Sequence, residues 1–182
     1  MKAKFFCRIC SCLNWALQLT CAASLFAGKN WTQFKNDSRH SGDAPDQEVK
    51  LPLGLVGTVP LMDAVFTSPV VANGRVFVVD GSGTAYGINA ESLQTEWRFP
   101  EQSEASNCNN VSSPAYINGF LHFGTMNGSY FVLDAKTGQP RAEIRTGEPI
   151  FSSPVVANGR VYFATLGSKV YALEPDGDVL WQ

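Results

Sequence analysis

The chain carries nearly the same fourteen-residue stretch twice, FTSPVVANGRVFVV at Phe66–Val79 and FSSPVVANGRVYFA at Phe151–Ala164, with ten of the fourteen positions identical. A weaker copy, VSSPAYINGFLHFG, lies between them at Val111–Gly124. The Ser-Pro pairs place their prolines at Pro69, Pro114 and Pro154, 45 and 40 residues apart. A period of this length matches one four-stranded blade of a β-propeller. The repeat therefore constrains the fold more than any other feature.

Each copy has the local pattern of short strands joined by tight turns. Proline is tolerated at the first residue of a strand, and Asn-Gly between apolar runs is the strongest short-range hairpin signal. The Asn-Gly pairs are Asn73-Gly74, Asn118-Gly119 and Asn158-Gly159. The strands expected after them are Val76–Val79, Leu121–Phe123 and Val161–Phe163, then Ala85–Ile88, Tyr130–Leu133 and Val170–Leu173, then a fourth strand ending near Trp97 or Trp181.

No sustained helical period appears after residue 28. The sequence therefore predicts an all-β chain, a partial β-propeller of about three four-stranded antiparallel blades. Their expected boundaries are residues 66–110, 111–150 and 151–182.

The repeat sequence resembles a known family. SPVVANGRVYFATLGSKVYALEPDGDVLW is similar to the pyrroloquinoline-quinone-type (PQQ-like) β-propeller repeat, and LDAKTG matches its hallmark turn, with Asp134 and Gly138 at the two ends. Trp31–Phe34 and Arg39–Gly42 resemble a segment that often precedes the first blade in secreted members. The resemblance covers residues 31–182, and its nearest analogue is the propeller lipoprotein of the outer-membrane β-barrel assembly machinery.

The same resemblance implies that one tryptophan of each repeat docks a blade on the next. Trp97 and Trp181 occupy that position, and Ala142 replaces it in the middle repeat. We therefore expect the second blade junction to be less well packed than the first.

Residues 1–28 have the pattern of a secretory signal peptide. Three basic residues precede the apolar run Trp15–Ala27, which is short for a bilayer span. An N-terminal helix retained in the fold is the alternative interpretation. The leader predicts an exported protein, periplasmic or extracellular. Membrane association is expected to be indirect only, or through a lipidated Cys21, although Gln18-Leu19-Thr20 fits a lipoprotein signal poorly.

The cysteines and charges point to neither a metal site nor a nucleic-acid partner. Four of the five cysteines lie in the leader, which leaves Cys108. Acidic residues outnumber basic ones by 16 to 14. The basic residues form no stripe that could bind nucleic acid. We therefore predict no metal ligands and no nucleic acid as a partner.

No catalytic or cofactor-binding residue is predicted either. Quinone-binding members of the resembling family usually hold their cofactor with adjacent cysteines, a calcium ion and a catalytic aspartate. This sequence has no Cys-Cys pair, and its two histidines, His40 and His122, lie far apart along the chain. PQQ is expected only if the full-length protein is a quinoprotein. Asp80–Gly83 is interpreted as a hairpin turn and not as a calcium loop.

Two further segments carry expectations about closure. Residues 29–65 form an N-terminal lead-in in which Leu55–Pro60 resembles the outer strand that closes a ring, but the third repeat already has its own outer strand. Blades one and three are therefore expected to present uncovered faces, which favour missing C-terminal blades or self-association. The five-residue insertion in the loop Pro100–Asn110, which holds Cys108, has no assigned role.

Three functions remain open. The first is a non-catalytic extracytoplasmic scaffold or protein-interaction propeller, by analogy of fold. The second is a fragment of a PQQ-dependent dehydrogenase, and the third is the sensor ectodomain of a larger signalling protein. The sequence does not name the partner.

Overall fold

We analysed a computed structural model of the chain, which describes residues 30–100 and 109–182. All helix or strand structure in these two ranges is β-strand. The strands are β1 (Val70–Ala72), β2 (Arg75–Val79), β3 (Ala85–Asn89), β4 (Thr95–Phe99), β5 (Ala115–Ile117), β6 (Phe120–Gly124), β7 (Ser129–Asp134), β8 (Pro140–Arg145), β9 (Val155–Ala157), β10 (Arg160–Ala164), β11 (Val170–Leu173) and β12 (Val179–Trp181). Within the described ranges, therefore, no helix could cross a membrane.

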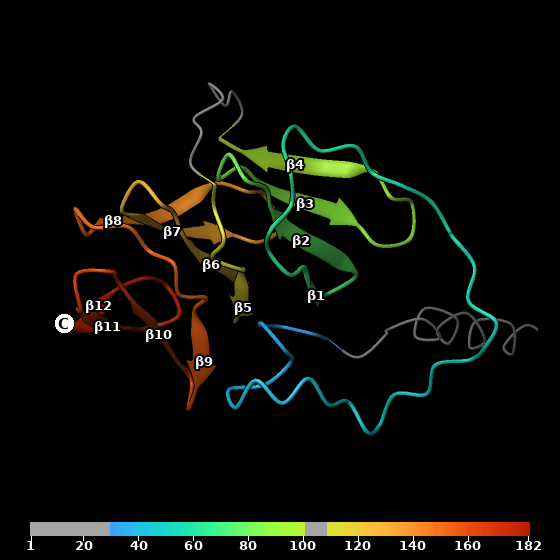
Figure 1. Cartoon of the computed structure of the whole chain (residues 1–182), viewed down its shortest axis with the longest axis horizontal. Helices are drawn as coiled ribbons and strands as arrows, with labels where there is room; N and C mark the ends of the chain where they lie inside the picture. Colours follow the sequence, from blue (N-terminus) through green and yellow to red (C-terminus); the bar gives the residue numbers. More distant parts are fainter. Residues whose placement is uncertain (1–29, 101–108) are drawn as a thin grey trace, which may run out of the picture.

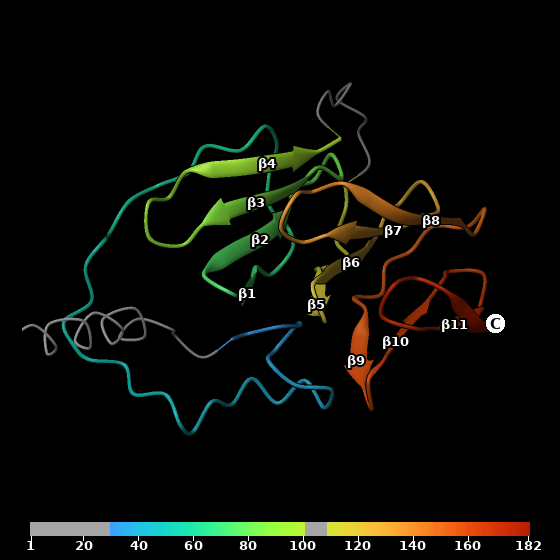
Figure 2. The same cartoon turned by 180° about the vertical axis from the view of Figure 1, so that it is seen from behind.

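The strands form three separate four-stranded sheets, each a meander of consecutive antiparallel strands. Figure 1 shows the three blades side by side, and Figure 2 shows them from behind. The first strands β1, β5 and β9 lie next to one another along the inner side of the arc. Each blade has a register shift between its third and fourth strands, after Gly87, Val132 and Ala172. The all-β prediction of three four-stranded antiparallel blades is confirmed.

The repeated residues begin and turn the strands. The first strand of each blade starts immediately after Pro69, Pro114 or Pro154. In the following Asn-Gly pairs both φ angles are positive: 50° and 73° at Asn73-Gly74, 48° and 90° at Asn118-Gly119, and 50° and 75° at Asn158-Gly159. Two positive φ angles in succession define the type I′ turn that matches the twist of a hairpin.

The apolar core lies between the blades. One cluster joins Phe77 and Val79 of blade one to Leu121 and Phe123 of blade two. A second cluster joins blades two and three, where Tyr130 stacks on Phe163 with ring centroids 3.9 Å apart. Burial of such aromatic faces stabilises the blade junctions.

The structure corrects the expectation for the N-terminal lead-in. Leu55–Pro60 forms no strand, because the sheets of the described chain offer it no free third strand to pair with. Instead, Val59 within this run and Leu61 just after it pack on the outer face of blade one, against Val78 and Tyr86. The prediction that blade one has an uncovered face is therefore wrong at this place. The predicted signal peptide, Cys21 and Cys108 lie outside the described residues.

Candidate docking surfaces of the blades

The two hydroxyl residues before each repeated proline have different roles. The first hydroxyl belongs to Thr67, Ser112 or Ser152 and bonds the end of the second strand in its own blade. Ser112 Oγ also donates to the main-chain oxygen of Ser152 in blade three, at 2.8 Å. Thr67 Oγ1 donates to the main-chain oxygen of Val79 at 2.6 Å. Ser152 Oγ donates to the main-chain oxygen of Ala164 and accepts from its N–H, both at 2.8 Å. This hydroxyl therefore joins the segment just before the first strand to the end of the second strand, where no backbone pairing continues.

The second hydroxyl belongs to Ser68, Ser113 or Ser153 and connects neighbouring blades. The N–H of Ser68 donates to Ser113 Oγ at 2.9 Å, and the N–H of Ser113 donates to Ser153 Oγ at 3.0 Å. Equivalent residues of successive blades thus form a hydrogen-bonded chain along the arc. A buried main-chain N–H without such a partner would cost free energy.

Four directly opposed residues cross each blade and point to the same side, and we call them the docking row. The rows are Val70, Phe77, Gly87 and Trp97 in blade one; Ala115, His122, Val132 and Ala142 in blade two; and Val155, Tyr162, Ala172 and Trp181 in blade three. Cross-strand neighbours on one face act as a unit in sheet packing. The rows of blades one and two face the next blade.

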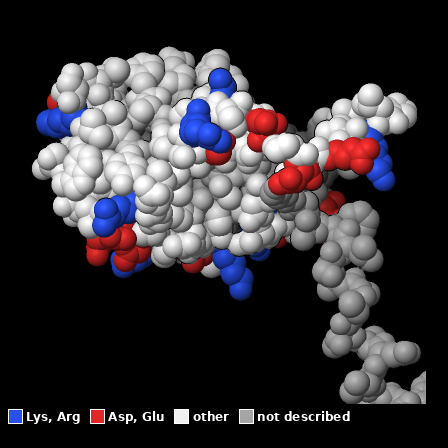
Figure 3. Space-filling view, turned by 90° about the horizontal axis from the view of Figure 1, so that it is seen from below, with Lys and Arg blue, Asp and Glu red and all other residues white. Residues whose placement is uncertain are grey.

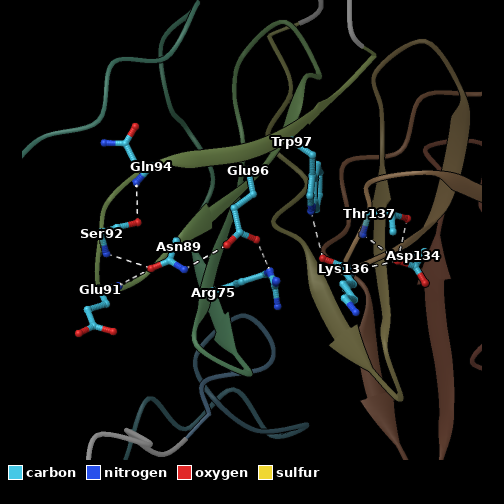
Figure 4. A network of polar contacts seen from close by, with 11 residues as sticks. Arg75, Asn89, Glu91, Ser92, Gln94, Glu96, Trp97, Asp134, Lys136 and Thr137 are labelled. Carbon is cyan, nitrogen blue, oxygen red and sulfur yellow. Dashed lines mark hydrogen bonds and ion pairs between the residues drawn. The ribbon is translucent and has the colours of Figure 1, made fainter.

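Trp97 anchors the first docking row to blade two. Its indole Nε1 donates to the main-chain oxygen of Ala135 at 3.1 Å, and the ring covers the turn that ends at Gly138. A Cβ atom at Gly138 would lie 2.6 Å from the indole. Figure 4 shows Trp97 directed from β4 toward that turn. Within its own blade the ring lies over Gly87, whose missing side chain leaves the space for it.

The turn that receives Trp97 is ordered by its first residue. Asp134 Oδ1 accepts from the N–H groups of Lys136 and Thr137 and from the Thr137 hydroxyl, at 2.8–3.0 Å. These donors, the Thr137 hydroxyl foremost, lower the pKa of Asp134. Asn89 caps the matching turn of blade one in the same way, through the N–H groups of Glu91 and Ser92. The hallmark aspartate therefore shapes a docking surface.

The second docking row fills its junction differently from the expectation. Ala142 lies opposite Val132, and together they contact Gly177 of blade three. A Cβ at Gly177 would lie 2.8 Å from Ala142 and 3.1 Å from Val132. In blade one the small residue, Gly87, is on the third strand and the large residue, Trp97, is on the fourth. In blade two the order is reversed, so Val132 on the third strand fills the space that the small Ala142 on the fourth strand leaves.

His122 occupies the position in blade two that Phe77 has in blade one. Its imidazole is fully buried, and Nε2 lies 2.8 Å from the main-chain oxygen of Pro175 in blade three. Since a carbonyl only accepts, Nε2 carries the proton. Burial lowers the pKa of His122 to about 4 despite this bond. The histidine is thus a neutral docking residue between two blades.

Asp80 is the buried carboxylate that could suggest a metal or quinone site. Its oxygens accept from the Ser82 N–H and hydroxyl, the Thr84 N–H and the Tyr86 hydroxyl, at 2.6–3.0 Å. Burial and Asp80 raise the pKa of Tyr86 to about 12. The carboxylate thus has four donors from its own blade. The described residues form no cluster of three His, Cys, Asp or Glu suited to a metal ion.

The third docking row is partly exposed: Ala172 is buried and Val155 and Tyr162 are half-buried, whereas Trp181 lies open to solvent. Trp181 is 51% exposed and Val170, on the same face, is 47% exposed. Tyr162 lies 6.3 Å from the Trp181 ring, centroid to centroid. No described blade covers this row, although it has the same order as the first row: an aliphatic residue, an aromatic, a small residue and a tryptophan. The face in Figure 3 carries both basic and acidic side chains.

The three meander blades are linked by serine hydroxyls, and at the first junction Trp97 docks on a glycine-containing turn. These features define a β-propeller arc of the PQQ-type repeat class. A family model described as outer membrane protein assembly factor BamB matches residues 56–143 and 111–182. These ranges span more than half of the chain, and the chain belongs to this family.

Curated relatives come from two kinds of protein. The chain is 26% identical over 117 residues to the quinohemoprotein alcohol dehydrogenase ADH-IIG of Pseudomonas putida, covering 58% of this chain and 16% of that protein. It is 26% identical over 121 residues to the outer membrane protein assembly factor BamB of Moranella endobia, covering 62% of this chain and 31% of that protein. The chain thus spans less than a third of these relatives.

Solved structures share the fold. The quinohemoprotein alcohol dehydrogenase of Comamonas testosteroni has a TM-score of 0.66 at 19% identity, over 84% of this chain and 26% of that one. BamB of Moraxella catarrhalis has a TM-score of 0.56 at 20% identity, over 68% and 38%.

The structure brings together repeat positions that the sequence treated separately. Trp97 contacts Gly138, and Asp134 shapes the turn that ends at Gly138. Pro69, Pro114 and Pro154 place the serines of the hydroxyl chain. The sequence analysis identified the recurring Ser-Pro pairs but assigned no role to their serines.

Proposed function

We propose that this chain is a non-catalytic, extracytoplasmic propeller module that binds a protein partner through the docking row of blade three. The observation that carries the proposal is the equivalence of Trp181 and Trp97 in their rows. Trp97 is covered by the next blade, and Trp181 is half-exposed.

The row defines the chemistry of its partner. The first junction pairs an indole N–H with a main-chain oxygen, and the indole face with a glycine in a tight turn. A partner for Trp181 therefore presents a β-sheet with a glycine-containing turn and a free carbonyl. A further blade of a longer chain and a separate β-sheet protein both fit this description.

Export and partner type are supported by relatives and by the leader. One relative is named as an outer membrane assembly factor, and residues 1–28 have the pattern of a signal peptide. Both support a periplasmic or extracellular location. Association with a membrane would follow from the partner, or from a lipidated Cys21.

Photo-crosslinking in the native host tests this proposal. Tyr162 is replaced by the photoreactive residue p-benzoylphenylalanine. Lys136, which is exposed on a turn of blade two, is the control position. A discrete adduct at 162 and none at 136 is expected, and its mass distinguishes a foreign protein from a second copy. No adduct at 162, or equal adducts at both positions, would contradict the proposal.

A quinone-dependent dehydrogenase is the second candidate, favoured by the match to the Pseudomonas putida enzyme. Its test is a redox-dye assay on the complete protein with added PQQ and calcium. Dye reduction by an alcohol or a sugar would favour the dehydrogenase over the non-catalytic module.

A further inference from the structure

Three consecutive residues of the N-terminal segment contact the three blades in order. Trp31, Thr32 and Gln33 hydrogen-bond to Val71, Tyr116 and Val156 respectively. These three partners occupy the same repeat position, two residues after the Ser-Pro proline, on β1, β5 and β9. In Figure 1 this segment, drawn in blue, lies beside these inner strands.

The first two contacts use main-chain groups of the segment. The N–H and oxygen of Trp31 both pair with Val71, each at 2.8 Å, as in an antiparallel ladder. The oxygen of Thr32 accepts from the N–H of Tyr116 at 2.7 Å. An inner strand has one edge without a sheet partner, and such edges accept an added strand.

The third contact uses a side chain in place of the main chain. The Gln33 carboxamide accepts from the Val156 N–H through Oε1 at 2.8 Å and donates to the Val156 oxygen through Nε2 at 3.2 Å. A carboxamide carries the same donor and acceptor as a peptide group. Gln33 is only 6% exposed, so these bonds form largely out of solvent.

The segment is also anchored at its flanks. Asn30 Oδ1 accepts from the N–H of Asn73 at 3.2 Å. On the other side, Asp37 accepts from the N–H groups of Arg39 and Ser41 and from the Ser41 hydroxyl, at 2.7–3.0 Å. These bonds fold the chain after Gln33 into a compact turn.

We propose that the inner rim of the arc, the edges of β1, β5 and β9 at Val71, Tyr116 and Val156, is a peptide-binding site whose ligand is carried in the same chain as residues 31–33. The site recognises an extended peptide by its main chain at two blades and by a carboxamide side chain at the third. A carboxylate in that position keeps the acceptor but lacks the donor, so glutamine is selected over glutamate. The rim is closed to other peptides while the segment is bound.

Hydrogen exchange of the whole chain tests the Gln33 contact. In Gln33→Ala the Val156 amide is expected to exchange at least tenfold faster, while the Val71 amide, held by the main chain of Trp31, changes less. Gln33→Glu is expected to retain part of the Val156 protection, and the exposed Gln47→Ala is the control. Unchanged Val156 exchange in Gln33→Ala, with the fold intact by circular dichroism, would overturn the role of Gln33.

Cleavage of the folded chain tests whether the segment is a ligand. A site-specific protease sequence is inserted between Leu53 and Gly54, where Leu53 is exposed and nothing packs on Gly54. After cleavage the N-terminal piece is expected to co-elute with residues 54–182, and excess peptide of residues 30–42 should displace it. The same peptide with Gln33→Ala should displace it at least fivefold less effectively. Dissociation on cleavage alone, or equal displacement by both peptides, would overturn the proposal.

Discussion

Trp97 and Gly138 are in direct contact across the first blade junction. Neither residue can be replaced by a different side chain without disturbing this contact. The indole leaves no room for a Cβ atom at Gly138, where the nearest ring atom would be 2.6 Å away. The backbone of Gly138 is also left-handed, with φ of 73°. The same φ of 73° occurs at Gly74, where nothing lies within 4 Å of an added Cβ.

These two glycines separate packing from backbone strain. Gly74→Ala is expected to cost about 1 kcal/mol of unfolding free energy, because only the positive φ is strained. Gly138→Ala is expected to cost roughly 2 to 4 kcal/mol, because the methyl group also displaces the indole. Urea titration of both variants gives the comparison. Equal losses would mean that Trp97 does not hold this junction.

The pH dependence of stability should report on His122. Its pKa falls from 6.5 unfolded to about 4 folded, so the unfolded chain binds the proton first as pH falls. The stabilisation is fully present above pH 6.5 and is lost between 6.5 and about 4. Its total is about 3 kcal/mol at 1.36 kcal/mol per pKa unit.

The control for that prediction is His122→Phe, because blade one has a phenylalanine, Phe77, at the equivalent position. Other titrating groups are shared by both proteins, so the difference in unfolding free energy between them isolates the histidine. We expect the unfolding free energy of the wild type to decrease relative to that of the variant as pH falls from 7 to 4. A difference that stays constant with pH would contradict the burial of a neutral His122.

Asn110 should be a destabilising residue. Its amide is buried, and both polar atoms lack a hydrogen-bond partner among the described residues. In the next repeat the matching position is Ile150, which is fully buried. Asn110→Ile is therefore expected to stabilise the chain by about 1 to 3 kcal/mol, and Ile150→Asn to destabilise it. Loss of stability in Asn110→Ile by thermal or urea unfolding would reveal a bonded role for the amide.

The serine chain gives a matched pair of variants at one repeat position. Ser113→Ala removes the acceptor for the Ser68 N–H and is expected to cost about 1 to 3 kcal/mol, as for a buried donor left unpaired. Ser68→Ala removes a hydroxyl for which the described chain shows no hydrogen bond, and it should change stability by less than about 0.5 kcal/mol. The claim fails if Ser68→Ala proves the more damaging substitution in urea.

Sequence reasoning succeeded where the signal is local. Asn158-Gly159 specifies its turn through the φ preferences of two adjacent residues, and Pro154 marks the start of its strand. It failed at Ala142, because the compensation by Val132 depends on strand register and is invisible in a list of repeat positions.

Long-range contacts were out of reach for a different reason. Gln33 and Val156 are 123 residues apart, and no periodic pattern links a single glutamine to a strand edge. The lead-in was also misjudged at Leu55–Pro60, where an apolar run suggested a strand. A strand forms only where a sheet edge is available, and Val59 and Leu61 instead lie on the face of blade one.

The central claim is that the partly exposed docking row of blade three works as the covered row of blade one does. The most direct test is the yield of the photo-crosslink from position 162 with and without the Trp181 indole. We predict that Trp181→Ala lowers the yield at least fivefold while the chain still unfolds cooperatively in urea, because the exposed half of this indole is the part available for docking. An unchanged yield in Trp181→Ala would contradict the account.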